Sequence, residues 1–160
     1  MPLWAIYHSP STFTTSAEKS ALVAAITDIY TNPAGPALPK FYVVVQFFAL
    51  ESSNFYVGGI PRPSPQNPSS NEPGGDPSIP FVRITIQNIA RKIGNDTVRD
   101  RFLTRVDDAL KPHIEDKGYD WEYSVLETSR DLWKVQGLVP PMPGTEEEGI
   151  WRKENKAVKL

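Results

Sequence analysis

The sequence presents one order of elements twice, and this duplication limits the fold more than any other feature. Residues 2–31 run from a proline through an apolar strand to a helix, and residues 80–110 repeat that order. A further strand is predicted after each unit, over 41–50 ("FYVVVQFFAL") and 119–127 ("YDWEYSVLE"). Strand, helix and strand at this spacing form a βαβ unit with parallel strands and a right-handed crossover. The chain is therefore predicted to hold two tandem βαβ units.

Both predicted helices carry start and stop signals. Thr15, followed three residues later by Glu18, predicts a capping box. Four apolar residues then share one helical face: Leu22, Ala25, Ile26 and Ile29. Asn32 and Pro33 end this helix. The second helix is predicted from about Asp96, and Pro112 disrupts its last turn.

Two such units side by side predict an α/β (α+β) fold, with a four-stranded mixed sheet and two helices on one face. The other face stays apolar and needs a cover, which predicts an oligomer. The chain is expected to be a single domain over 1–160. Its first βαβ unit covers about 2–60, a proline-rich loop 61–80, the second βαβ unit about 81–127 and a C-terminal arm 128–160.

The proline-rich loop and the arm stand outside the duplicated pattern. The loop holds seven prolines, which predicts polyproline character, and a segment this long is either disordered or a cover. A PxxP-type ligand for a protein partner is the alternative. The arm is expected to be extended, with "TEEEG" at 145–149 as a solvated run. Met142 and Trp151 are expected to pack against something, such as a neighbouring subunit.

Composition argues against several functions. Without cysteine there is no disulfide or cysteine chemistry. The chain has two histidines, His8 and His113, and both are expected at the surface or an edge. Two histidines alone make a zinc site unexpected. A net charge of −2 gives no reason to expect nucleic acid or an anionic membrane as partner, and no stretch approaches the roughly 20 apolar residues of a membrane span. Without a signal-peptide pattern the chain is expected to be cytoplasmic, with only a weak peroxisomal resemblance in the final "AVKL".

Pro2 is the sharpest candidate for chemistry. A small residue after Met1 generally permits removal of Met1, which would give Pro2 a free secondary amine at the end of a buried strand. Burial disfavours the charged form and lowers the pKa of such an amine. A neutral amine near pH 7 acts as general base or nucleophile, and a protonated one as general acid. The ordinary alternative is a Met-Pro start without functional consequence.

These features together resemble the tautomerase superfamily, and within it most closely the cis-3-chloroacrylic acid dehalogenase branch and its fungal relatives. The resemblance spans Pro2 to about Trp151 and rests on "MPLWAIYH", "SAEKSALVAAITDIY", "NFYVGG", "WEYSVLE" and "GLVPPMPG". It implies trimers of duplicated chains, with no metal or organic cofactor. It also implies that the amino-terminal proline catalyses keto–enol tautomerisation, or adds water to haloacrylates with loss of halide.

The resemblance also implies roles for single residues. Pro2 matches the catalytic amine, and Tyr123 matches a tyrosine that positions or activates water. Arg91 matches the second of two arginines that hold the substrate carboxylate, but Asn88 stands in place of the first. Arg83 would substitute for that first arginine only if its side chain points into the pocket.

Two further positions depart from the dehalogenase pattern. Tyr30 replaces a histidine, and Val135 falls near the acidic residue that activates water, with Glu127 the nearest acid outside that register. A dehalogenase must deprotonate water, whereas tautomerisation needs one amine and one cation, and a single guanidinium can bind a carboxylate bidentately. The residues therefore predict a tautomerase acting on a small 2-oxo or unsaturated carboxylate. Arg91 would hold the carboxylate, and Tyr30 and Tyr123 would place the reacting end.

Three alternatives stay open. The chain is a cis-3-haloacrylate dehalogenase or hydratase, or it is a non-catalytic oligomeric scaffold that kept the fold. Arg91, for its part, simply pairs with an acidic neighbour.

Overall fold

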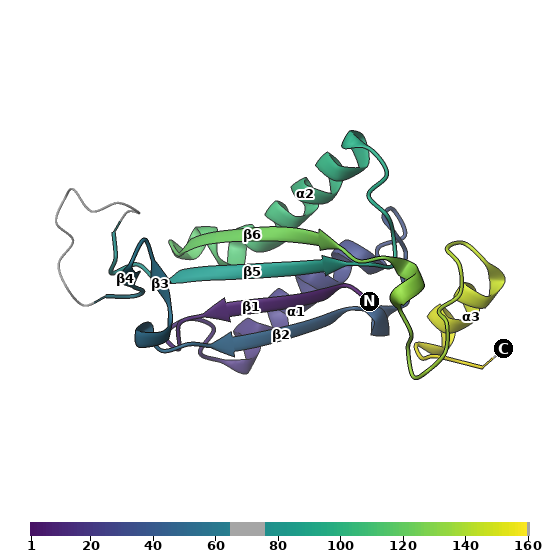
Figure 1. The fold of residues 1–160 in the computed structure, drawn as a ribbon, viewed down its shortest axis with the longest axis horizontal. Coiled ribbons are helices and arrows are strands. Elements are labelled where there is room, and N and C mark those ends of the chain that lie inside the picture. The colour runs from purple at the N-terminus through teal and green to yellow at the C-terminus, as the bar shows by residue number, and fades with distance from the viewer. Residues whose placement is uncertain (65–75, 160) are drawn as a thin grey trace.

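A four-stranded mixed sheet forms the centre of the computed structural model, which describes residues 1–64 and 76–159. The strand order is β2-β1-β5-β6 (Figure 1). The strands are β1 (Leu3–His8), β2 (Val44–Ala49), β5 (Phe81–Asn88) and β6 (Asp120–Glu127). The pairs β1–β2 and β5–β6 are parallel, and β1–β5 in the middle is antiparallel. Two tandem βαβ units side by side in one mixed sheet were predicted, and this architecture is confirmed; the structure adds that the units join through their first strands.

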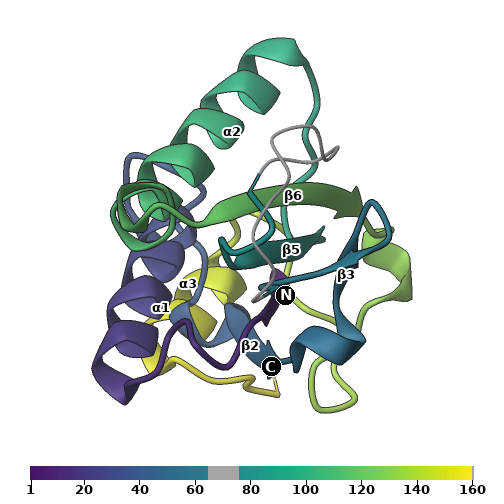
Figure 2. The same cartoon turned by 90° about the vertical axis from the view of Figure 1, so that its left-hand side faces the viewer.

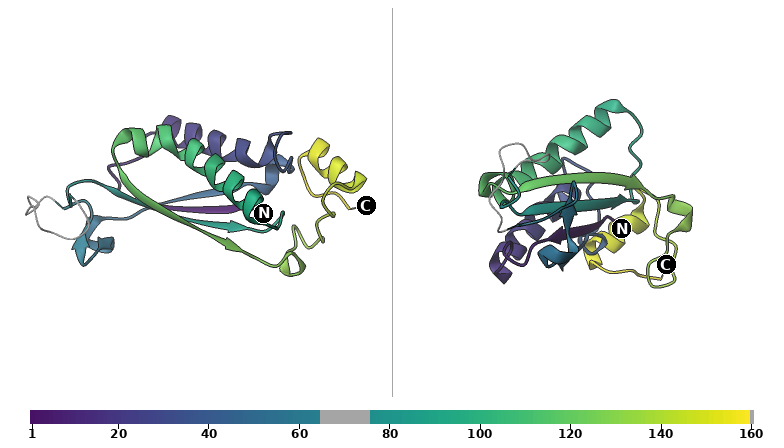
Figure 3. Two further views of the ribbon diagram at one scale, coloured as in Figure 1. Left: turned by 90° about the horizontal axis from the view of Figure 1, so that it is seen from above. Right: turned by 60° about the vertical axis from the view of Figure 1, so that its left-hand side comes forward.

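Helices α1 (Ser16–Thr31) and α2 (Asp96–Leu110) lie on one face of this sheet (Figures 2 and 3). Thr15 and Glu18 form the predicted capping box, and Asn32 is the C-cap of α1. Asn95 caps α2 by accepting a hydrogen bond from the Val98 N–H at 2.9 Å. Within the described residues, no helix has the length and apolar character needed to cross a membrane.

The core lies between the sheet and these two helices because side chains alternate across a strand. Even-numbered residues of β1 and β5 face the helices and are buried: Trp4, Ile6, His8, Val82, Ile84, Ile86 and Asn88. His8 was expected at the surface, and that expectation was wrong. Its register puts the ring inside, where Nδ1 lies 2.8 Å from the Ser9 carbonyl and 3.0 Å from Thr12 Oγ1.

Short elements complete the two units. Strands β3 (Tyr56–Val57) and β4 (Ile60–Pro61) form a hairpin whose turn, Gly58-Gly59, has positive φ at both residues. The predicted strand over 41–50 begins late, because η1 makes a single 3-10 turn before it. The 3-10 helices are η1 (Lys40–Tyr42), η2 (Ser52–Asn54), η3 (Lys111–His113), η4 (Glu115–Lys117) and η5 (Arg130–Leu132). Of the predicted proline-rich loop, residues 65–75 lie outside the described residues.

The arm contains a third helix, α3 (Glu146–Glu154), where an extended segment was predicted. Thr145 caps it, and three glutamates in its first turn complement the positive end of the helix dipole. Trp151 is buried against Phe41 and Tyr42 of the same chain. Met142 remains 62% exposed.

The face of the sheet opposite α1 and α2 carries no helix (Figure 3). The odd-numbered residues of β1 lie on this open face, and Tyr7 stacks on Phe48 of β2 with ring centroids 5.0 Å apart. Phe48 is 39% exposed. An uncovered face with apolar residues is what the sequence predicted for an oligomerising chain.

Candidate active site

Pro2 lies at the start of β1, under the helix-covered face of the sheet. It is buried, and its carbonyl accepts a hydrogen bond from the Val44 N–H at 3.0 Å. Its even number gives it the same orientation as Trp4. The antiparallel register pairs Leu3 with Gln87 and so brings Pro2 next to Asn88. The candidate amine therefore belongs to the end of the sheet where β1 begins and β5 ends (Figure 1).

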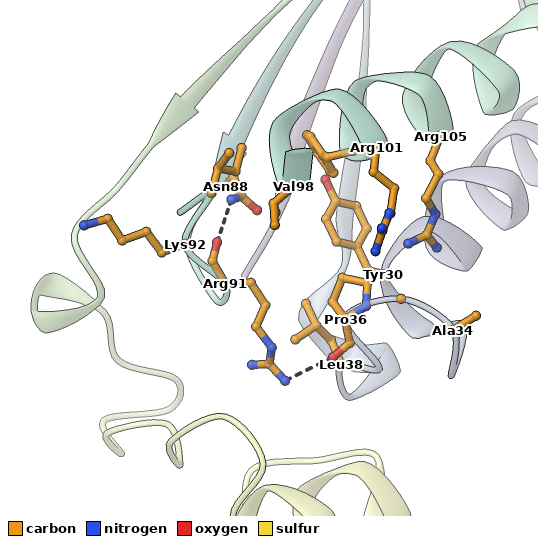
Figure 4. A pocket seen from close by; sticks show the side chains of 13 residues that line it. Tyr30, Ala34, Pro36, Leu38, Asn88, Arg91, Lys92, Val98, Arg101 and Arg105 are labelled. Atoms are coloured by element: carbon orange, nitrogen blue, oxygen red, sulfur yellow. Dashed lines mark hydrogen bonds between the residues drawn. The ribbon is translucent and has the colours of Figure 1, made fainter. Parts of the chain in front are cut away.

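A cavity of about 290 Å³ opens at this end of the sheet. Its walls come from the end of α1 and the loop after it, the loop after β5, and the first turns of α2 (Figure 4). Three of the residues predicted for the site line it together: Tyr30, Asn88 and Arg91. Two arginines of α2 that the sequence analysis did not single out, Arg101 and Arg105, line it as well.

The Tyr30 hydroxyl is anchored by the first strand. It accepts a hydrogen bond from Trp4 Nε1 at 3.0 Å, and Tyr30 is only 1% exposed. Burial raises the pKa of this hydroxyl above its ordinary value, although the Trp4 hydrogen bond and the Arg105 charge oppose the shift. The hydroxyl is thus protonated at neutral pH. Because the Tyr30 oxygen accepts the hydrogen bond from Trp4, the hydroxyl can still donate its own proton to another acceptor.

Asn88 organises the loop after β5. Its Nδ2 donates a hydrogen bond to the Arg91 carbonyl at 2.7 Å, and Glu127 Oε1 lies 3.5 Å from the same nitrogen. Glu127 also accepts a hydrogen bond from the Ile93 N–H at 2.8 Å. These contacts fix the turn that carries Arg91 along the cavity wall.

The Arg91 guanidinium is bound by a carboxylate of the arm. Its two Nη atoms lie 2.9 and 3.0 Å from the two oxygens of Glu148, whose side chain is 1% exposed. Arg91 also donates to the Pro36 carbonyl at 3.1 Å, and the Gly144 N–H donates to Glu148 at 2.9 Å. Glu148 was expected in a solvated run, and that expectation was wrong because α3 turns it inward. The spacing from Thr145 to Glu148 is a capping signature that would have predicted this helix start.

Pro2, Tyr123 and Arg83 do not line the cavity, although Pro2 lies beside Asn88, which does. Tyr123 pairs with Ile84 further along the sheet, and its hydroxyl donates to Asp107 Oδ1 of α2 at 2.8 Å. Arg83 has the opposite orientation on β5 and donates to Ser124 Oγ at 2.8 Å on the open face. The condition attached to Arg83, that it point into the pocket, is therefore not met within one protomer.

The amino terminus lies in surroundings that disfavour a charged amine. Burial, and after it the Arg130 charge, lower the pKa of the Met1 amino group from 8.0 to about 4. Arg130 comes from the arm, donates to the Pro140 carbonyl at 2.9 Å and lies over the Trp133 ring. The sequence analysis missed Arg130, because only the folded arm brings it to this end of the sheet.

The Tyr42 hydroxyl is a further buried polar group close to these charges. It has no hydrogen-bond partner among the described residues. Burial, reinforced by the Glu148 charge, raises the pKa of Tyr42 to about 12. No group of three His, Cys, Asp or Glu residues in 1–64 and 76–159 is placed to hold a metal ion.

Comparison with known proteins gives the family. A family model described as "Putative oxalocrotonate tautomerase enzyme" matches residues 1–156, so the chain belongs to this tautomerase family. The predicted resemblance to the tautomerase superfamily is confirmed, and with it a tautomerase-like enzyme class. No curated protein matches the chain.

Solved structures agree with this assignment. A probable enzyme from the thermophilic fungus Aspergillus fumigatus shares 41% identity, with 100% of this chain and 98% of that chain covered and a TM-score of 0.83. Native RhCC from Rhodococcus jostii RHA1 shares 37% identity over 99% of both chains, also at a TM-score of 0.83. A fused 4-OT symmetric trimer matches at 16% identity and a TM-score of 0.56, covering 86% of this chain and 96% of that one, which shows the shared fold alone.

Proposed function

We propose that this chain is a tautomerase in which Pro2, freed of Met1, moves a proton on a small 2-oxo or unsaturated carboxylate. The observation that carries the proposal is the state of the amino terminus, where burial and Arg130 lower the pKa of the Met1 amine to about 4. The Pro2 nitrogen is one residue further into the same surroundings, and Pro2 itself is buried. We expect burial to favour a neutral Pro2 amine in the same way once Met1 is removed, and a neutral amine is the form a general base needs.

The proposed reaction is a proton transfer within an enol carboxylate. Pro2 takes the proton from the enol oxygen, the C=O bond forms as the C=C π bond breaks, and the protonated amine delivers a proton to the other carbon of that double bond. The O–H bond breaks, the new C–H bond forms, and the 2-oxo acid leaves a neutral amine behind. Tyr30, whose own proton remains for donation, stabilises the oxygen as negative charge develops on it. Tyr123 is the second residue proposed to position the substrate. Its hydroxyl would first have to give up its hydrogen bond to Asp107.

Arg91 is the residue assigned to the substrate carboxylate by resemblance. Because both of its Nη groups already lie on Glu148, the substrate carboxylate either takes the place of Glu148 or binds elsewhere in the cavity. Displacing Glu148 would leave its carboxylate buried without its principal partner, which costs several kcal/mol. That cost favours a carboxylate position elsewhere in the cavity.

The proposal is tested by Pro2→Ala in ketonisation of phenylenolpyruvate, followed by the loss of enol absorbance. The variant keeps a free amino terminus but makes it a primary amine on a flexible residue, so kcat/KM is expected to fall by at least about a hundredfold. Ser16→Ala, an exposed change at the start of α1, serves as the matched control. Unchanged turnover in Pro2→Ala would overturn the mechanism.

A dehalogenase or hydratase function for cis-3-haloacrylates is the second candidate, and Glu148 is the observation that favours it. The structure brings this carboxylate to Arg91, although Val135 stands near the position where the dehalogenase carries its acid. Halide release that needs Glu148 and Tyr123, and that survives loss of enol turnover, would select this function.

We further propose that the chain assembles as a homotrimer through its open sheet face. The exposed Phe48 and its stack on Tyr7 support this proposal, as does the trimeric assembly named for the fused 4-OT structure. A chain that keeps Met1 attached and still forms the trimer would be the non-catalytic scaffold considered from the sequence.

A further inference from the structure

The cavity holds two arginines whose charge no described carboxylate neutralises by an ion pair. Arg101 and Arg105 are four residues apart on α2, so they lie on the same side of the helix. Figure 4 shows the two side chains extending side by side from α2 toward the loop that carries Ala34 and Pro36. Their guanidinium groups end on the same side of Tyr30 (Figure 4), with Arg101 exposed and Arg105 half-buried.

The other two cationic residues that line the cavity, Arg91 and Lys92, do not offer a free positive charge to it. Arg91 is neutralised by Glu148 at 2.9 and 3.0 Å. Lys92 extends away from the cavity (Figure 4). Arg101 and Arg105 therefore supply the positive charge that the cavity offers to an anion.

Three of the four aspartates of α2 have partners other than these two arginines. Asp96 and Asp100 both bind Arg99 at 2.8 Å, on another side of the helix. Asp107 accepts the Tyr123 hydroxyl at 2.8 Å. Asp28 and Asp108 line a second groove together with Arg105, but neither forms an ion pair with it.

Gly35 leaves the space in which the Arg105 guanidinium lies. A Cβ at Gly35 would collide with Arg105 Nη1, so any other residue there would push the guanidinium away. Arg105 makes one weak hydrogen bond, to the Asp28 carbonyl at 3.4 Å, which holds its position without neutralising its charge. Its charge reaches the Tyr30 hydroxyl, since it acts to lower the pKa of that group.

We propose that Arg101 and Arg105 bind the carboxylate of the substrate, in place of the arginine pair implied by resemblance. Two parallel guanidinium groups hold a carboxylate by charge-assisted hydrogen bonds. Phe102 and Leu38 give the same cavity an apolar part, which suits the rest of a small organic acid. This inference rests on the proposed function for the substrate class, but its test does not require turnover.

The test is equilibrium binding of phenylpyruvate, the ketonisation product, by isothermal titration calorimetry at fixed salt. Arg101→Gln and Arg105→Gln are each expected to raise Kd at least tenfold, since each removes a charged hydrogen-bond donor. Arg99→Gln removes the same charge from the same helix, outside the cavity, and is expected to bind as the unmodified chain does. Gly35→Ala keeps every charge but displaces Arg105, so it is expected to weaken binding as well.

Kinetics separate this inference from the proposed function. In phenylenolpyruvate ketonisation the two α2 variants are expected to raise KM and leave kcat close to that of Arg99→Gln, as loss of uniform binding does. If Arg101→Gln and Arg105→Gln bind phenylpyruvate as tightly as Arg99→Gln, the inference is overturned, whatever Pro2→Ala does. If they weaken binding while Pro2→Ala leaves turnover unchanged, the carboxylate position stands and the proline mechanism fails.

Discussion

Replacing Glu148 by glutamine tests whether the arm is fastened to the sheet by its ion pair with Arg91. The substitution keeps the size of the side chain but removes the charge that receives both Arg91 Nη groups and the Gly144 N–H. Breaking a buried pair costs about 3–5 kcal/mol. Arg91 is a quarter exposed and the amide keeps one acceptor, so we expect a smaller loss of stability, about 2–3 kcal/mol.

The assay is urea unfolding followed by tryptophan fluorescence, with Trp151 of α3 as one reporter. A loss of about 2–3 kcal/mol corresponds to a drop in Tm of roughly 5–10 °C for a chain of this size. Glu146→Gln is the matched control, because Glu146 is exposed in the same first turn and contributes under about 1 kcal/mol through the helix dipole. If Glu148→Gln destabilises the chain no more than Glu146→Gln, the buried pair does not fasten the arm.

Three further predictions concern the core, the amino terminus and the open face. Tyr30→Phe leaves the buried Trp4 indole N–H without its acceptor, so urea unfolding should show a loss of about 1–3 kcal/mol; stability equal to that of the unmodified chain would contradict the hydrogen bond. In a chain that keeps Met1, the folded amine has its pKa lowered from 8.0 to about 4, so between these values only the unfolded chain binds the proton. Stability should therefore fall as pH drops from 8 toward 4, and N-terminal acetylation should remove that part of the slope, which urea titrations at several pH values would measure. Phe48→Asp places a charge on the open face, where Phe48 stacks on Tyr7, and sedimentation should show a trimer replaced by smaller species; an unchanged mass would place the interface elsewhere.

The sheet and its two helices were predictable because their signals are local. The capping box at Thr15 and the alternation along β1 and β5 each depend on a few neighbouring residues. The burial of His8 was missed although it follows from the same alternation. A histidine was treated as polar by type, while its register on the strand decided its place.

The candidate site was predictable only in part, since its residues come from separate elements. The resemblance led to Tyr30, Asn88 and Arg91, and the structure brings these three to one cavity. Arg83 falls on the opposite face by the same alternation along β5, whereas the place of Tyr123 depends on the register between β5 and β6, which the sequence does not give.

Two contributions of distant segments were missed for a different reason. Glu148 is 57 residues from Arg91 along the chain, and only the return of the arm to the sheet joins them. Arg101 and Arg105 carry a helical i,i+4 spacing, but their freedom from ion pairs depends on where the α2 aspartates find partners. Such contacts leave no short-range pattern to read.

The most direct test of the proline mechanism is an intact mass spectrum before and after exposure to 2-oxo-3-pentynoate. This small carboxylate carries an electrophilic carbon–carbon triple bond that reacts with a neutral amine. We predict a chain that lacks Met1 and gains one adduct, mapped to Pro2 and suppressed by excess phenylpyruvate. A chain that retains Met1, or a free Pro2 that gains no adduct, would contradict the account and favour the scaffold.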